Sequence, residues 1–247
     1  MKTCDLNCDM GEGIGNDAAI IPFITSANIA CGYHAGDEKT MLETVLLAKK
    51  FGVAIGAHPS FFDRENFGRT NMPHITPQQV YGLVTEQLKL LSKIVLENNT
   101  QLHHVKPHGA LYNMASKNAE LSKAIARVVY DFDRRLILFG LSGSQLISEA
   151  KVLGLTTASE VFADRTYQDD GSLTPRTQTN ALLEREDESI MQVLQMVKSG
   201  RVTACSGKEI TLVAETICLH GDGKNAVAFA KAIHYKLLAE NIVLKAM

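Results

Sequence analysis

The sequence lacks several features that would assign it to a familiar class of protein. No apolar run in its 247 residues reaches the roughly 18 residues that span a bilayer. The formal net charge of −2 argues against a general binder of nucleic acid or anionic membranes, because neither surface would attract it. The five cysteines are odd in number and form no close C-x-x-C pair. We therefore expect reduced thiols in a cytoplasmic protein.

Several catalytic and nucleotide-binding signatures are missing as well. The loop at residues 11–15 is neither G-x-G-x-x-G nor a Walker P-loop, so no nucleotide site of these types is recognisable. The absence of G-x-S-x-G argues against a serine hydrolase. No H-E-x-x-H motif occurs either, and the H-x₃-H spacing from His104 to His108 lies in a predicted strand segment instead of a helix. Any metal site therefore has to be assembled from separate segments of the chain.

What the sequence does contain is a regular alternation of short apolar runs and amphipathic stretches. The apolar runs predict buried parallel strands over residues 53–57, 102–105, 136–139 and 216–219. The amphipathic stretches predict helices over residues 37–51, 76–97, 117–132, 143–152, 187–199 and 222–240. Asp37 and Thr76 are expected to cap the first two helices, and Asp222 is expected to start the last.

The number of these units points to one fold class. About seven β–α units without a break in composition favour a single α/β domain over residues 1–247, closed into a (β/α)7-type barrel. An open doubly wound sheet is the alternative. Two long connections, 58–75 and 163–186, interrupt the alternation, and loops of that length are usually functional or mobile. The second contains Arg165 and Arg176, each of which fits either a substrate carboxylate or a surface salt bridge.

The first predicted strand carries an unusual number of polar groups. Side chains alternate along residues 5–9, so Asp5, Asn7 and Asp9 share the face that would point into a barrel lumen. Polar groups in a lumen are costly unless they bind a ligand or one another. Glu12 follows directly, and crowded carboxylates suit general acid–base work or cation binding. The alternative is a strand whose acids pair with lysines or cap the next helix.

Five of the eight histidines follow a short apolar run and precede a small or turn-forming residue. They are His34, His58, His104, His108 and His220. Because the carboxyl ends of barrel strands converge in space, we expect these histidines to form one rim with Asp9 and Glu12. Imidazoles and carboxylates are the usual ligands of a hydrolytic Zn²⁺ or similar ion. His34, His58 and His108 are therefore candidate ligands of a divalent metal ion.

A lysine lies among these histidines. Alternation puts His104, Lys106 and His108 on one strand face. A lysine in the lumen would balance the acids, or would hold a carboxylate or oxyanion of a substrate. Its charge would also repel a bound metal ion, so the imidazoles could instead move protons. The other histidines, His74, His103 and His234, fit surface or core equally well and are given no role.

Six blocks of the sequence, in order from residue 3 to beyond residue 230, resemble the LamB/YcsF family. They are DLNxDxGE from Asp5, SANIACGYHAGD from Ser26, GAHPSFxDRENFGR from Gly56, HVKPHGALYN from His104, EVFADR from Glu160 and CLHGD from Cys218. The resemblance implies a seven-stranded (β/α) barrel similar to polysaccharide deacetylases. It also implies a component of an ATP-consuming assembly that opens the lactam of 5-oxo-L-proline to L-glutamate, with two partner subunits, B and C.

The resemblance also implies roles for individual residues. Asp9 and Leu219-His220 stand where, in the deacetylase relatives, a first-strand Asp and a last-strand Leu-His flank a metal-bound water. We expect Asp9 or Glu12 as general base on water and His220 as general acid to the leaving nitrogen. Lys106 would be an oxyanion or carboxylate clamp. The residues expected to contact the substrate are Asp5, Asn7, Asn28, Arg165 and Arg176.

Three functions follow from these expectations. The first is hydrolysis of an activated lactam in this chain, with ATP-dependent activation largely in the partners, because this chain has no recognisable phosphate loop. The second is a stand-alone metal-dependent deacetylase or amidohydrolase, which would work without ATP. The third is a non-catalytic subunit that binds the lactam while the partners carry out the chemistry.

Overall fold

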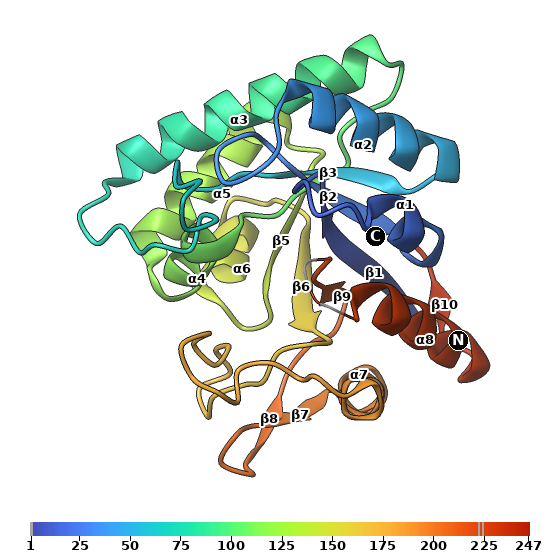
Figure 1. Cartoon of the computed structure of the whole chain (residues 1–247). Helices are drawn as coiled ribbons and strands as arrows, with labels where there is room; N and C mark the ends of the chain where they lie inside the picture. Colours follow the sequence, from blue (N-terminus) through green and yellow to red (C-terminus); the bar gives the residue numbers. More distant parts are fainter. Residues whose placement is uncertain (1, 222, 224) are drawn as a thin grey trace.

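A computed structural model describes residues 2–221, 223 and 225–247. Its centre is a ring of parallel strands with helices packed outside it (Figure 1). In pairing order the ring contains β1 (Thr3–Met10), β2 (Ser26–Ala30), β3 (Ala54–His58), β4 (His104–Val105), β5 (Ile137–Leu141), β6 (Thr157–Phe162) and β9 (Thr216–Leu219). Because β9 pairs back with β1, the ring is closed. The predicted (β/α)7-type barrel is therefore confirmed, and the open doubly wound sheet is excluded.

The helices form the outer layer. They are α1 (Asp17–Ile20), the 3-10 helix η1 (Ile21–Phe23), α2 (Glu38–Phe51), α3 (Pro77–Glu97), α4 (Gly109–Lys117), α5 (Ala119–Asp133), α6 (Gln145–Val152), α7 (Glu186–Ser199) and α8 (Ala226–Ala239). Two of them begin at the predicted caps. The side chain of Asp37 accepts a hydrogen bond from the main-chain N–H of Thr40, and Thr76 forms a capping box with Gln79.

Some elements differ from the sequence prediction. The helix expected over residues 117–132 is confirmed as α5, which begins after Asn118 as its cap, whereas α4 precedes it and was not predicted. The predicted start of the last helix, Asp222, lies outside the described residues, and α8 itself begins at Ala226. The apolar pattern does not predict β2 or β6, because both strands carry inward polar side chains that break it.

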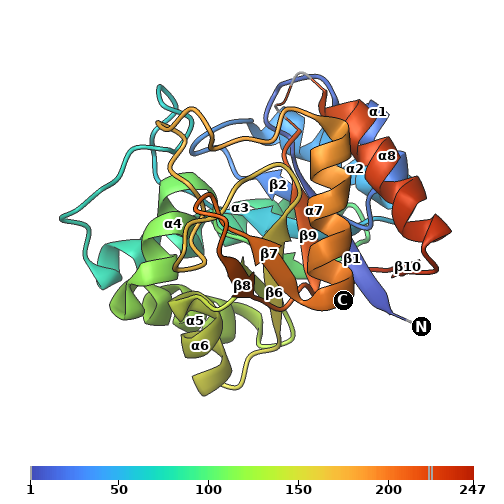
Figure 2. The same cartoon turned by 90° about the horizontal axis from the view of Figure 1, so that it is seen from below.

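A long excursion leaves the barrel between β6 and β9 (Figures 1 and 2). It contains the 163–186 loop, α7 and an antiparallel hairpin of β7 (Arg201–Thr203) and β8 (Glu209–Thr211). After α8, the short strand β10 (Val243–Leu244) pairs with the first residues of β1. Within the described ranges, no helix has both the length and the apolar character needed to cross a membrane.

The apolar core lies between the ring and the helices, whereas the lumen of the ring is polar. On β1, Leu6 and Cys8 are fully buried in the core, while Asp5 and Asn7 are equally buried but bond across the lumen. Among the residues that the structure describes, no buried side-chain nitrogen or oxygen lacks a hydrogen-bond partner. Hydrogen bonds therefore stabilise the polar side chains of the lumen, while Ile137, Phe139 and Ala158 form a small apolar cluster of their own.

Candidate active site

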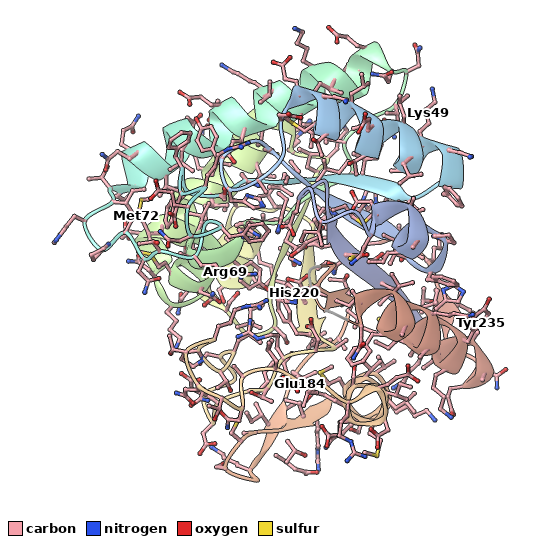
Figure 3. The ribbon with its side chains drawn as sticks, in the orientation of Figure 1. Lys49, Arg69, Met72, Glu184, His220 and Tyr235 are labelled. Carbon is pink, nitrogen blue, oxygen red and sulfur yellow. The ribbon has the colours of Figure 1, made fainter. Side chains whose placement is uncertain are left out.

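The carboxyl ends of the strands open into a cavity of about 720 Å³. Its wall includes Asp9, His58, Lys106, His108 and His220, which come from four different strand ends. Figure 3 shows His220 near the centre of the molecule, with Arg69 on the neighbouring 58–75 loop. Parallel barrels bind their ligands at this end of the strands. The fold thus brings these predicted residues together although they are far apart in sequence.

The floor of the lumen lies below this cavity and is built around Asp5. The carboxylate of Asp5 accepts hydrogen bonds from the hydroxyls of Thr25 at 2.6 Å, Ser26 at 2.7 Å and Thr216 at 2.5 Å. Burial raises the pKa of this carboxyl group. Asp5 is not among the described residues that line the cavity. The predicted contact of Asp5 with the substrate is therefore not supported, because Asp5 is held by the hydroxyls of the lumen floor.

One layer higher, Asn28 holds Asp9. The amide nitrogen of Asn28 donates to Asn7 Oδ1 at 2.7 Å and to Asp9 Oδ1 at 2.8 Å. Neither asparagine is among the described cavity-lining residues, so Asn28 supports Asp9 directly and Asn7 supports it through Asn28. His104 also lies at this level, fully buried, with Nε2 2.8 Å from Asn28 Oδ1. The prediction that His104 belongs to the rim is therefore wrong, because it points into the lumen below the cavity.

Lys106 crosses the lumen between two carboxylates. Its Nζ lies 2.9 Å from Asp9 Oδ1 and 2.9 Å from Glu160 Oε1, and it donates to Cys218 Sγ at 2.9 Å. Burial alone would lower the pKa of Lys106, but Asp9 and Glu160 raise it well above its usual value. The ammonium group is therefore charged at neutral pH. These contacts agree with the prediction that Lys106 balances the charge of the acids in the lumen. The two carboxylates also offset the positive charge that would otherwise repel a metal ion.

Asp9 is the point at which the lumen meets the cavity. Its second oxygen, Oδ2, lies 3.2 Å from Nε2 of His58. Burial alone would raise the pKa of Asp9, but the neighbouring His58 and Lys106 lower it well below its usual range. Asp9 is therefore ionised at neutral pH although it is only 4% exposed.

The three candidate metal-binding histidines each direct one ring nitrogen away from the site. His58 Nδ1 lies 2.7 Å from the main-chain oxygen of Lys106, and His108 Nε2 lies 2.9 Å from that of Phe67. A carbonyl oxygen can only accept, so these two nitrogens carry the protons. His34 Nδ1 lies 2.9 Å from Ser60 Oγ, whose hydroxyl donates to Phe61. That hydroxyl must accept from His34.

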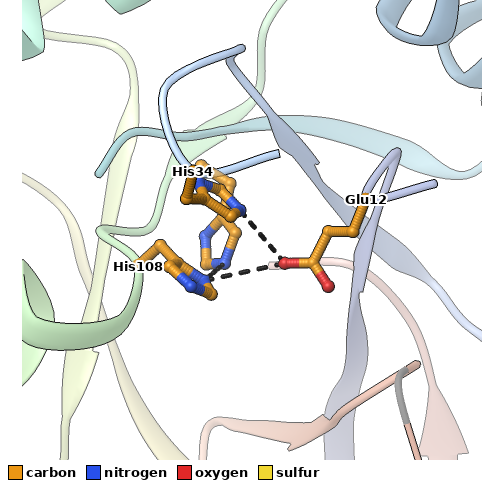
Figure 4. Close-up of side chains that lie close together, drawn as sticks. Glu12, His34 and His108 are labelled. Carbon is orange, nitrogen blue, oxygen red and sulfur yellow. Dashed lines mark hydrogen bonds and ion pairs between the residues drawn. The ribbon is translucent and has the colours of Figure 1, made fainter. Parts of the chain in front are cut away.

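The remaining ring nitrogens converge on one another and on Glu12 (Figure 4). His58 Nε2 lies 2.8 Å from His108 Nδ1, and His34 Nε2 lies 3.1 Å from Glu12 Oε1. The ligand atoms of Glu12 and the three histidines all lie within 4.8 Å of one another. Lone pairs and a carboxylate that face each other repel, unless a shared proton or a cation lies between them. This donor set fits a divalent metal ion, with the outward N–H groups orienting the ligands.

Burial sets the charge of these rings. It lowers the pKa of His34 and of His108 well below the usual histidine value, and it does the same to His104 below them. All three rings are therefore neutral at pH 7. Neutral imidazole is the form that binds metals.

The buried histidines make the metal-free chain sensitive to acid. In the unfolded chain His34, His104 and His108 each take up a proton near the ordinary histidine pKa, but in the folded chain they do not. The free energy of unfolding therefore decreases as the pH is lowered. Between about pH 7 and about pH 5.5 each ring should cost about 1 kcal/mol of unfolding free energy. Asp5, whose pKa is raised, acts with the opposite sign. We expect a net loss of about 2 kcal/mol.

Urea unfolding in the presence of a chelator at the two pH values measures this loss. The His104→Gln variant should show a smaller pH dependence, by about 1 kcal/mol, because it removes one of the three titrating rings. Equal stability of the wild-type chain at both pH values would contradict the neutral state of the rings.

His220 is oriented by an acid from the neighbouring strand end. Its Nδ1 lies 2.9 Å from Oδ2 of Asp164, which follows β6. Burial alone would raise the pKa of Asp164, but His220 and Arg176 lower it below its usual value. Asp164 is therefore ionised and fixes the proton of His220 on Nδ1, which leaves Nε2 for a second partner.

The two predicted arginines both line the cavity, but they are held differently. Arg165 is 5% exposed, and its Nε and Nη2 donate to the main-chain oxygens of Ala181 at 3.2 Å and Thr174 at 2.5 Å. It thereby fixes the fold of the 163–186 loop. Burial, with Arg176 nearby, lowers the pKa of Arg165 to about 10, so it stays charged at neutral pH. Arg176 and Arg69 line the same cavity, whose wall therefore attracts anions.

Three residues of this site were not singled out by the sequence analysis. Glu160 could have been found, because it is an acid at an inward position of an otherwise apolar strand end. Asp164 and Ser60 give no such signal, since their partners His220 and His34 lie 56 and 26 residues away in sequence. Only the closed barrel brings these pairs together.

The fold defines a class of parallel (β/α) barrels that extends to proteins with little sequence similarity. A family 4 carbohydrate esterase from Streptomyces lividans shares the fold with a TM-score of 0.53 and 12% sequence identity, over 100% of this chain and 92% of that chain. Within this class, the chain belongs to the LamB/YcsF family, whose sequence model matches residues 4–247. The family predicted from the six sequence blocks is therefore confirmed.

Relatives match over the whole length of the chain. The A component of 5-oxoprolinase from Geobacillus thermodenitrificans is 53% identical over 251 residues, which is 100% of this chain and 98% of that protein. The crystal structure of a lactam utilization protein from Thermus thermophilus superposes with a TM-score of 0.92 and 40% identity, over 100% of both chains.

Proposed function

We propose that this chain is one component of an ATP-dependent 5-oxoprolinase and that it hosts the hydrolysis of the lactam of 5-oxo-L-proline to L-glutamate. The single observation that carries the proposal is the convergence of Asp9, the histidine cluster and the His220–Asp164 pair on one cavity. The names of the two full-length relatives, a lactam utilization protein and a component of 5-oxoprolinase, support this substrate. The partners would be 5-oxoprolinase subunits B and C.

In this proposal Asp9 removes a proton from the attacking water. Asp9 is ionised and lies at the cavity wall, but its low pKa makes it a weak base. A divalent ion held by His34, His58, His108 and Glu12 would supply the complementary chemistry, because it lowers the pKa of water to about 7. Of the two carboxylates predicted as the base, Asp9 fits better, since Glu12 Oε1 is directed at His34 and His108.

His220 then protonates the leaving group. The water oxygen bonds to the carbonyl carbon, the ring C–N bond breaks, and the nitrogen departs as the amine of glutamate once it has received a proton. For this transfer Nε2 must itself carry a proton, so the ring acts as an imidazolium whose Nδ1–H is held by the ionised Asp164. Lys106 keeps Asp9 ionised, and Arg176 is placed to hold the substrate carboxylate in the cavity.

ATP has a separate place in the proposal. A five-membered lactam is a resonance-stabilised amide with little strain, so a form phosphorylated on its carbonyl oxygen would be attacked much more readily. Ring opening of that form leaves an acyl phosphate, and a second water molecule releases inorganic phosphate and glutamate from it. This sequence has no recognisable phosphate loop. We therefore place ATP-dependent activation in the partner subunits, with ATP consumed by the complex.

Replacement of His220 by glutamine is expected to lower kcat about a hundredfold, because the leaving nitrogen loses its proton donor. Asp164→Asn should cost about tenfold, since the imidazole remains but loses its orientation. Glutamate formation by the reconstituted complex measures both. His234→Gln serves as the control, because His234 binds the main-chain oxygen of Phe23, away from the lumen. Wild-type activity of His220→Gln would overturn its role.

The proposed function is tested by 5-oxoproline-dependent glutamate release. The purified chain is assayed alone, with subunits B and C, and with both of these and ATP, and its metal content is measured in the same sample. We expect release only in the complete mixture. Release by the chain alone from an N-acylated sugar or amide, without ATP, would instead support the deacetylase or amidohydrolase. Full activity of the complex with an Asp9→Asn chain would support the non-catalytic role.

A further inference from the structure

His104 is a buried titratable side chain that the proposed mechanism does not use. It lies on β4, is fully buried and is not among the described residues that line the cavity. Its ring stacks on Phe139, with ring centres 4.2 Å apart and planes at 13°. On the opposite side a Cβ at Gly56 would come within 2.0 Å of His104 Nε2. Phe139 and the absence of a side chain at Gly56 thus leave a space that the His104 ring fills.

The hydrogen bonds of His104 define its tautomer. The amide nitrogen of Asn28 donates to Asn7 and Asp9, so Oδ1 of Asn28 is the acceptor that faces His104 Nε2 at 2.8 Å. The proton of the neutral ring must therefore be on Nε2. His104 Nδ1 is then an acceptor, and it lies 3.2 Å from Nδ1 of His103. The Asn28 amide is thus held at both ends, by Asn7 and Asp9 through its nitrogen and by His104 through its oxygen.

The amide orientation matters because of Asp9. If the Asn28 amide turned over, the amide oxygen would face the ionised carboxylate of Asp9, in the place where the amide nitrogen now donates to it. Two acceptors would then oppose each other in a buried site, which is strongly unfavourable. If His104 did not donate, the buried side-chain oxygen of Asn28 would lose this hydrogen bond, and that loss would favour such a turn. The donor on His104 prevents both arrangements.

We propose that His104 is a positioning residue, which fixes the amide of Asn28 and thereby holds Asp9 in its place beside Lys106 and His58. The proposal rests on the proposed role of Asp9 in the reaction. His104 itself touches neither the cavity nor the reacting atoms. It acts through Asn28, so its loss should change the rate of the chemical step and not the binding of substrate.

The first test compares two substitutions of His104 in the reconstituted complex. His104→Leu removes the donor, and kcat should fall about tenfold to a hundredfold with KM nearly unchanged. His104→Gln retains an N–H donor at a similar position and should restore kcat to within about threefold of wild type. His234→Leu removes a hydrogen-bonded histidine outside the lumen, so it should leave kcat unchanged even where it lowers Tm.

The second test does not depend on activity. Nitrogen NMR of the histidine-labelled chain should show a neutral His104 ring with its proton on Nε2. Gly56→Ala should disturb this signal, because the new Cβ would occupy the place of the ring. If His104→Leu does not fold, His104→Gln and the NMR tautomer still decide the question.

The outcomes separate this inference from the proposed function. An Asp9→Asn complex without activity, together with a folded His104→Leu complex of wild-type kcat, would overturn the positioning role alone. Full activity of both variants would overturn the role of Asp9 as well. A proton on Nδ1 of His104, or equal losses of kcat in His104→Leu and His104→Gln, would also overturn the inference.

Discussion

Replacement of Asp9 by asparagine is expected to lower kcat for glutamate formation by about a thousandfold, because a proton acceptor is lost and catalysis by a positioned base is worth about 10² to 10⁴. The asparagine keeps the size of the side chain but not its charge. Lys106 then loses the charged Asp9 and keeps its contact with Glu160, and the amide faces His58 without a negative charge. The effect should therefore fall on kcat more than on KM.

The measurement is ATP-dependent glutamate release by the reconstituted complex, with circular dichroism and Tm to show that the variant is folded. Asp131→Asn is the matched control. Asp131 is also an ion-paired acid, with Arg127, but it lies on the outside of α5. Asp131→Asn should have wild-type kcat. More than about a tenth of the wild-type rate in Asp9→Asn would contradict a role in proton transfer.

The second large effect concerns the histidine cluster. The chain is expected to bind one divalent ion, with Zn²⁺ or Co²⁺ as the probe, and His108→Ala should weaken this binding at least about a hundredfold. The reason is geometric, since Nδ1 of His108 lies 2.8 Å from Nε2 of His58 and 3.7 Å from Oε1 of Glu12. Activity in the complex should fall with metal content.

Calorimetry in two buffers of different protonation enthalpy adds a sharper readout. If a proton is shared between the facing nitrogens in the ion-free chain, metal binding has to release it. His74→Ala is the control, because His74 is an exposed histidine of the 58–75 connection. Full activity of a chelator-treated complex, together with no measurable binding of a divalent ion by the chain, would contradict the proposed metal site.

Much of the site follows from strand geometry that the sequence already displays. The alternation of Asp5, Asn7 and Asp9 predicts a polar lumen, and the structure places all three there. The histidines that follow β2, β3 and β4 converge because parallel strands present their carboxyl ends at one rim. The alternation of side chains along a strand and the convergence of strand ends are sufficient to predict where these residues lie.

Depth within the lumen is what the sequence does not reveal. His104, Lys106 and His108 share one face, but each lies two residues, or about 7 Å, from the next along the strand direction. The pattern therefore groups three residues with different surroundings, and only the register of β4 with β3 places His104 beside Gly56. The sequence also does not reveal which partner a charged side chain binds. The guanidinium of Arg165 donates hydrogen bonds to main-chain oxygens of its own loop.

The closure of the ring by β9 and β1 restricts how this chain can assemble with other proteins. An open sheet presents unpaired main-chain N–H and C=O groups along its edge, and a partner can add a strand there. In this barrel the pairing of β9 with β1 removes that edge from the ring. On the ring itself a partner can therefore recognise only side chains of the surrounding helices and loops, and strand addition is left to the β7–β8 hairpin and β10 outside it.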